Sequence, residues 1–163
     1  MPHKASVLIR ISEQKLYLLD ELEEVIQQYL VSTSKYGVGS EESSYKTPLG
    51  KHCISDKIGE TASRREVFIG REAKGVLEEL LEQNIKLPED IITSRILWLG
   101  GLESGVNRGG NIDTHQRYIY IHGTPEEDKI GIPVSHGCIR MRNDDVIDLF
   151  DQVEEGCEVI IEE

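Results

Sequence analysis

The chain has 163 residues, enough for one compact domain, and its 38% hydrophobic residues together with 15 glycines are typical of a globular protein and exclude wholesale disorder. The formal net charge of −12 at pH 7 argues against binding to nucleic-acid phosphates or to an anionic membrane surface. No apolar run reaches the roughly 18 residues that a transmembrane helix needs. We therefore expect a single domain over residues 1–163, with no nucleic-acid partner and no membrane span.

The first third of the chain is predicted to be rich in strands. Short runs of Val, Ile, Leu and Tyr indicate strands at residues 6–11, 16–19, 25–26 and 29–31. Residues 32–50 collect Ser, Thr and Gly and end in a Thr-Pro-Leu-Gly turn, which predicts a long surface loop. A further strand is expected at residues 52–54.

The middle of the chain is predicted to alternate between helix, strand and loop. Residues 72–83 carry apolar side chains at helical spacing, with glutamates on the opposite face, and therefore predict one amphipathic helix. Residues 91–92 and 96–99 predict strand. Gly100 and Gly101 then open a polar, Gly-rich segment that extends to Asn111 and is interpreted as a flexible loop or lid.

The last third predicts a strand, a helix and a final strand. Residues 117–121 alternate aromatic and aliphatic positions, as a strand buried on both faces does, and lead into His122. Asn143 is expected to cap a helix that ends near Gly156. The expected apolar face of this helix carries Val146, Leu149, Phe150 and Val153. Residues 159–161 predict the closing strand.

The cysteine count bears on the compartment. Cys53, Cys138 and Cys157 cannot all pair within one chain, which favours a reducing environment. The first residues show no signal-peptide pattern, so a cytoplasmic location is expected, with a periplasmic one as the alternative if a leader has been removed. Cys53 and Cys157 are interpreted as small buried apolar residues.

Residues 121–124 and 135–141 bring together the side chains with chemical potential. A thiol is weakly ionised at its ordinary pKa of about 8.5, so a nucleophilic Cys138 needs an imidazole nearby, and either His122 or His136 could serve. Gly137 allows a substrate to approach the backbone closely, and the amides of residues 137–139 are candidate oxyanion donors. The spacing suits acyl transfer.

These residues resemble the catalytic domain of the L,D-transpeptidases, cysteine enzymes that act on peptidoglycan. The family motif of a strand-end His-Gly followed by Ser-His-Gly-Cys-aliphatic-Arg is matched at residues 122–123 and 135–140. Tyr-Leu-Val-Ser-Thr at residues 29–33 and Thr-Pro-Leu-Gly at residues 47–50 also match. The resemblance covers residues 5–56 and 117–162, whereas residues 57–116 are predicted to be an inserted helix and loop region that forms a lid.

The resemblance implies a mainly β fold, with two packed sheets in a sandwich and flanking α-helices. It implies that the thiol attacks the L-to-D bond at diaminopimelate of a stem peptide or muropeptide, forms a thioester, and passes the acyl group to an amine or to water. The family is also a target of carbapenems, and no cofactor is implied. By the same resemblance Cys138 is the nucleophile, His122 is its base, and the Gly123 carbonyl orients the imidazole. The expected substrate-binding residues are Ser135, His136, Gly137 and Arg140.

Two other classes of function fit this sequence less well. A metal-binding module could use His122, His136 and Cys138, but the sequence lacks the Cys-x-x-Cys or His-x-x-x-His pairs usual in zinc sites. A catalytically silent binding domain would need a degraded motif, and this motif is intact. The acyl acceptor and the oligomeric state stay open.

Overall fold

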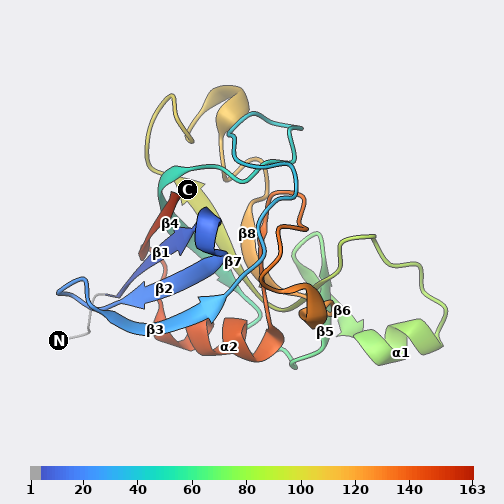
Figure 1. The fold of residues 1–163 in the computed structure, drawn as a ribbon. Helices are drawn as coiled ribbons and strands as arrows, with labels where there is room; N and C mark the ends of the chain where they lie inside the picture. The colour runs from blue at the N-terminus through green and yellow to red at the C-terminus, as the bar shows by residue number, and fades with distance from the viewer. Residues whose placement is uncertain (1–4) are drawn as a thin grey trace.

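The structure, a computed structural model, describes residues 5–163 as ten strands with two α-helices and three short 3₁₀ turns (Figure 1). The helices are α1 (Leu77–Glu82) and α2 (Asn143–Gln152). The strands are β1 (Ser6–Arg10), β2 (Lys15–Leu19), β3 (Val25–Leu30), β4 (Gly50–Ile58), β5 (Glu66–Ile69), β6 (Glu72–Val76), β7 (Ile92–Gly101), β8 (Tyr120–Gly123), β9 (Ile139–Met141) and β10 (Glu158–Glu162).

The strands form one mixed sheet in the order β3-β2-β1-β10-β4-β7-β5-β6, with β8 paired to β7 and β9 paired to β8. β1 with β10 and β8 with β9 run parallel, and the other pairs are antiparallel. The expected mainly β class with flanking helices is confirmed. The two expected sheets are hydrogen-bonded into one because the long β7 pairs with β4, β5 and β8.

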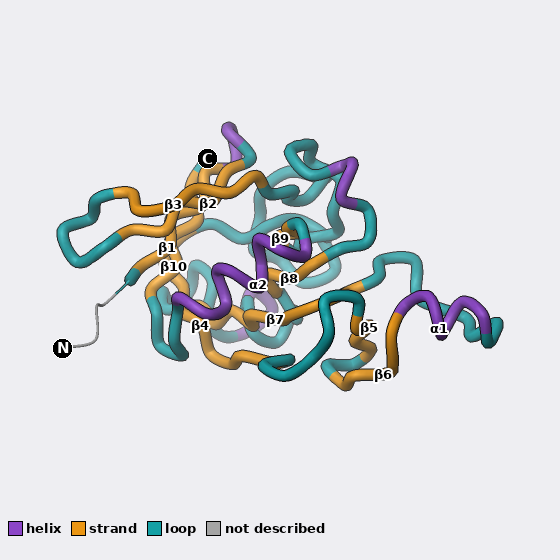
Figure 2. Tube along the Cα trace, turned by 90° about the horizontal axis from the view of Figure 1, so that it is seen from below, coloured by secondary structure: helices purple, strands orange, loops and turns teal. Residues whose placement is uncertain are grey.

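The main hydrophobic core lies between the strands and α2, which packs against β7 and β8 (Figure 2). The predicted apolar face of the last helix is confirmed, since Val146, Leu149 and Phe150 of α2 and the following Val153 are all buried. Burial of such side chains stabilises the fold by roughly 1.5–3 kcal/mol each. None of the helices in the described part of the chain combines the length and apolar character needed to cross a membrane.

The predicted helix over residues 72–83 is half wrong. Residues 72–76 form β6, which pairs with β5, and only Leu77–Glu82 are helical. The reason is the two-residue turn between these strands, in which Gly70 and Arg71 both have left-handed φ angles, +58° and +67°. Such a turn joins antiparallel strands with the correct twist, and the resulting hairpin overrides the helical pattern.

Residues 57–116, predicted to be an insertion or lid region, include part of the sheet. β7 belongs to this range and is a buried strand within the sheet, so that part is not an inserted loop. β5, β6 and α1 lie at one end of the molecule, away from β1–β3 (Figure 2). The Gly-rich segment is anchored by the buried Asn107, whose Nδ2 donates to the carbonyls of Leu49 and Lys51 at 3.1 and 3.0 Å. That the range is an insertion within the family stays a prediction.

Two details near the candidate site also differ. The strand expected at residues 117–121 begins later, at Tyr120, because Tyr118 has a φ of +57° and its side chain is exposed. Asn143 is the first residue of α2 and not its side-chain cap, since its amide points inward. Its Oδ1 accepts from the hydroxyls of Thr93 and Ser94, and its Nδ2 donates to the carbonyl of Thr124 at 3.0 Å.

Candidate active site

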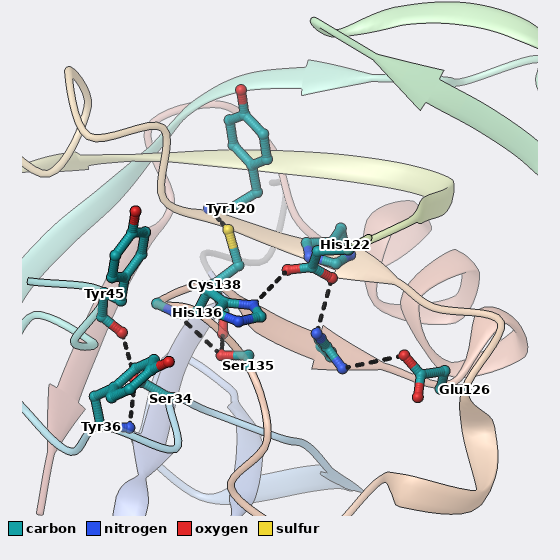
Figure 3. Close-up of polar contacts among 12 residues, drawn as sticks. Ser34, Tyr36, Tyr45, Tyr120, His122, Glu126, Ser135, His136 and Cys138 are labelled. Carbon is teal, nitrogen blue, oxygen red and sulfur yellow. Dashed lines mark hydrogen bonds and ion pairs between the residues drawn. The ribbon is translucent and has the colours of Figure 1, made fainter. Parts of the chain in front are cut away.

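The parallel pair β8 and β9 brings the two predicted motifs together. His122 on β8 lies in register with Arg140 on β9, and Cys138 immediately precedes β9. Residues 122 and 138 come from separate parts of the sequence, so this strand pairing is what creates the site. Figure 3 shows the Cys138 sulfur beside the backbone of Tyr120, with His122 further along the same strand.

Cys138 is partly exposed, and its sulfur contacts two backbone groups. The Tyr120 amide donates to Sγ at 3.3 Å, and the thiol donates to the Tyr118 carbonyl at 3.4 Å. Desolvation raises the pKa of the Cys138 thiol to about 12, although the Tyr120 amide opposes this shift. The nearby Asp90 charge raises this pKa further, whereas Arg140 lowers it. The thiol is therefore protonated at neutral pH and requires a base.

His122 is fully buried and is oriented by a backbone carbonyl. Its Nδ1 lies 2.6 Å from the Gly123 carbonyl oxygen, a contact that places the ring proton on Nδ1 and leaves Nε2 as an acceptor. Among residues 5–163, Nε2 has no hydrogen-bond partner. Burial lowers the pKa of His122, against the opposing influence of Asp90 and of the Gly123 hydrogen bond. The ring is thus neutral and has a free lone pair.

Asp90 is a residue of the site that the sequence analysis missed. Its Oδ1 lies 2.9 Å from Nη2 of Arg140, and its Oδ2 lies 3.7 Å from Nδ1 of His136. Arg140 is 4% exposed, and its other nearby carboxylate, on Glu126, lies 3.8 Å away. Asp90 follows Pro88 in an irregular segment with no motif around it, so no sequence signal could have identified it.

Arg140 consequently braces the site more than it offers a free positive charge. Its guanidinium is buried and neutralised by carboxylates, and its Cα pairs with Ser32 in an isolated bridge. Breaking a buried, charged hydrogen-bonded pair typically costs about 1–3 kcal/mol or more. The geometry favours bracing of the loop, and the expected substrate-binding role of Arg140 stays a prediction.

The loop before Cys138 is held by hydroxyl groups. Ser135 Oγ donates to the Cys138 carbonyl at 2.6 Å and accepts from the Gly137 amide at 3.3 Å, so this amide is not free for an oxyanion. Thr47 Oγ1, from the predicted Thr-Pro turn, donates to the Gly137 carbonyl at 3.0 Å. Gly137 has a φ of +123°, and a Cβ there would lie 3.2 Å from Ile119 Cδ1. The tight turn therefore requires glycine.

His136 faces a pocket and is linked to aromatic side chains. Its ring centroid lies 6.1 Å from that of Tyr36 and 6.0 Å from that of Tyr45 (Figure 3). The pocket has a volume of about 390 Å³. It is lined by Glu42, Ser43, Tyr45, Gln116, Arg117, Ile119 and His136. This position fits the expected substrate-lining role of His136 better than that of a base, although the role itself stays a prediction.

The metal-binding alternative gains no support from the geometry. Within residues 5–163, no three His, Cys, Asp or Glu side chains are grouped so that they could hold a metal ion. Cys53 and Cys157 are free thiols and only partly buried, and Cys157 packs against the edge of the main core. Both lie outside the group formed by residues 90, 122 and 138.

Comparisons with known proteins agree with the motif. The family model described as L,D-transpeptidase catalytic domain (YkuD) matches residues 4–161. The putative L,D-transpeptidase YqjB of Bacillus subtilis is 48% identical over 48 residues, 29% of this chain and 27% of that protein. The probable L,D-transpeptidase YcfS of Escherichia coli is 26% identical over 159 residues, 97% of this chain and 44% of that protein. The chain thus spans less than half the length of these relatives.

Solved structures share the fold. An L,D-transpeptidase from Mycobacterium smegmatis superposes with a TM-score of 0.57 at 18% identity, covering 99% of this chain and 59% of that one. L,D-transpeptidase 3 from Mycobacterium tuberculosis, in complex with a faropenem-derived adduct, gives a TM-score of 0.58 at 16% identity, covering 99% and 61%. At these identities the likeness establishes the architecture and no more.

Proposed function

Because the chain belongs to the L,D-transpeptidase catalytic domain family, we propose that it is a cysteine acyltransferase that acts on peptidoglycan stem peptides. The observation that carries the proposal is the pairing of β8 with β9, which sets an oriented, neutral imidazole on the strand next to the nucleophile loop. A thiol, a base and a group that holds the base's tautomer are the parts that such a reaction needs.

In the first half-reaction, Nε2 of His122 takes the thiol proton while Sγ of Cys138 attacks the carbonyl carbon of the L-to-D bond at diaminopimelate. The tetrahedral intermediate collapses as the C–N bond breaks. His122 returns the proton to the departing amine of D-alanine, and a thioester remains on Cys138. The hydrogen bond from Nδ1 to the Gly123 carbonyl keeps the imidazole in the tautomer that this transfer requires.

In the second half-reaction, the acceptor attacks the thioester. His122 takes a proton from the attacking amine or water, and the C–S bond breaks to regenerate the thiol. An amine acceptor gives a cross-linked or exchanged peptide, whereas water gives L,D-carboxypeptidase activity. The high thiol pKa implies that proton transfer accompanies the attack in the first half-reaction instead of preceding it.

The experiment uses a defined disaccharide tetrapeptide that ends in D-alanine, with and without an added amine. We expect D-alanine release and a thioester mass on Cys138 in the intact protein, and neither from Cys138→Ala. Cys53→Ala is the matched control because it removes a thiol outside the site. A folded wild-type protein that releases no D-alanine, or an acyl group found on Cys53 or Cys157, would refute the proposal.

The compartment is a separate part of the proposal. An odd number of thiols fits a reducing compartment, in which soluble muropeptides are the available donors. Where acceptor amines are scarce, water competes for the thioester and hydrolysis is favoured. Fractionation of the native cells tests the location, and recovery from the periplasm would contradict it.

A further inference from the structure

Arg71 lies on a surface of aromatic rings at the tip of the β5–β6 hairpin. Its guanidinium carbon is 5.0 Å from the ring centroid of Trp98 and 4.9 Å from that of Tyr118, and its Nη1 donates to Tyr120 Oη at 3.0 Å. Cation–π contacts and a hydrogen bond fix both the position and the plane of the guanidinium. The tight turn at Gly70 and Arg71 holds the base of the side chain.

In the described part of the chain, Arg71 forms no ion pair with a carboxylate. Among residues 5–163, no carboxylate lies within 4.0 Å of its guanidinium. The neighbouring Glu72 attracts Arg71 only over a longer distance and is itself paired with Lys74 at 3.0 Å. One of the five N–H groups of Arg71 is used by Tyr120, and the remainder can receive an anion.

Arg71 is separated from the nucleophile by one tyrosine side chain. The Tyr120 amide and the Tyr118 carbonyl contact Sγ of Cys138 at 3.3 and 3.4 Å, while the side chains of the same two tyrosines contact Arg71. Tyr118 adopts a left-handed conformation that is costly for an aromatic residue, and the residue is 54% exposed. This conformation directs its carbonyl to the thiol while its ring supports the guanidinium.

We propose that Arg71, on the shelf formed by Trp98, Tyr118 and Tyr120, is a specificity-determining residue that binds a carboxylate of the acyl donor beside Cys138. The inference rests on the proposed function and names the group recognised. A planar guanidinium binds a carboxylate through two parallel N–H···O hydrogen bonds. The donor carries two suitable groups, the α-carboxylate of the terminal D-alanine and the side-chain carboxylate of diaminopimelate.

The test measures binding apart from turnover. In a Cys138→Ala background, the emission of Trp98, the single tryptophan of the chain, is titrated with the tetrapeptide donor. Loss of a charge-assisted pair predicts that Arg71→Gln weakens binding about 10- to 100-fold, and that Arg71→Lys restores only part of it. Lys86→Gln, which removes one exposed charge from outside the hairpin, should leave the affinity unchanged. The melting temperature of each variant verifies folding.

Donors amidated at one carboxylate or the other identify the group. Arg71 holds the carboxylate whose amidation weakens binding of the donor to the parent protein. With that amidated donor, Arg71→Gln should cause no further loss of affinity. If Arg71→Gln binds free and amidated donors as well as the parent does, while the wild-type protein still releases D-alanine, the subsite is wrong and the proposed function stands. If the wild-type protein releases no D-alanine from any donor, the proposed function is wrong and the subsite fails with it.

Discussion

The protonation state of Cys138 before substrate arrives separates two mechanisms. With a thiol pKa of about 12, roughly one molecule in ten thousand carries a thiolate at pH 8, because each pH unit below the pKa lowers the ionised fraction about tenfold. A preformed thiolate–imidazolium pair would instead be almost fully ionised at that pH. Such an ion pair conflicts with the buried His122, whose pKa is lowered and whose Nε2 has no partner in the described part of the chain.

The assay is alkylation by iodoacetamide between pH 6 and 9.5, followed at the Cys138 peptide by mass spectrometry. Iodoacetamide reacts with the thiolate, so the rate should rise about tenfold per pH unit with no plateau. His122→Gln is the control, because removal of a neutral imidazole should leave this profile unchanged. A plateau between pH 6 and 8 that His122→Gln abolishes would show that the ion pair exists and that the reasoning from burial is wrong.

Three further predictions concern the base and the loop. Asp90→Asn leaves the buried Arg140 with only the more distant carboxylate of Glu126, so it should lower the free energy of unfolding by about 1–3 kcal/mol in urea titrations. It should also slow D-alanine release, and unchanged values would contradict the bracing role. His122→Gln should slow acylation about 10²- to 10⁴-fold and His136→Gln much less, and equal losses would reject the assignment of the base. Because the pKa of His122 is lowered, the acid limb of the kcat/KM profile should lie below pH 6.5. Gly137→Ala should destabilise the protein by about 1–3 kcal/mol, measured by thermal melting, since its φ is +123°; a neutral effect would mean that the loop relaxes freely.

The local hydrophobic pattern was sufficient to predict those strands and helices that have one apolar, buried face and one polar face. The strands near the start of the chain, the final strand and the apolar face of α2 were predictable because a period of two or of 3.6 residues records which side is buried. Residues 72–76 show the limit of that reasoning. They carry a pattern compatible with helix, but the turn at Gly70 and Arg71 pairs them with β5.

Some residues of the candidate site were likewise predictable from the sequence, and others were not. His122, Gly123 and Cys138 lie in contiguous motifs, and their spacing is visible without a fold. Asp90 is a single carboxylate in an irregular segment, and its link to Arg140 depends on tertiary placement alone. The absence of an ion pair at Arg71 was equally invisible, because a sequence shows which charges exist and not which of them lie in contact.

The place of β10 in the sheet determines when reactivity can appear during synthesis. This strand follows the nucleophile loop in the chain, yet it lies between β1 and β4 and joins β1–β3 to the rest of the sheet. The nucleophile loop depends on both parts of the sheet. The Ser135 amide donates to the carbonyl of Thr33, which follows β3, while β9 pairs with β8. A nascent chain on the ribosome therefore lacks an ordered nucleophile loop until β10 has emerged and inserted, and acyl transfer from a stem peptide should begin only after that point.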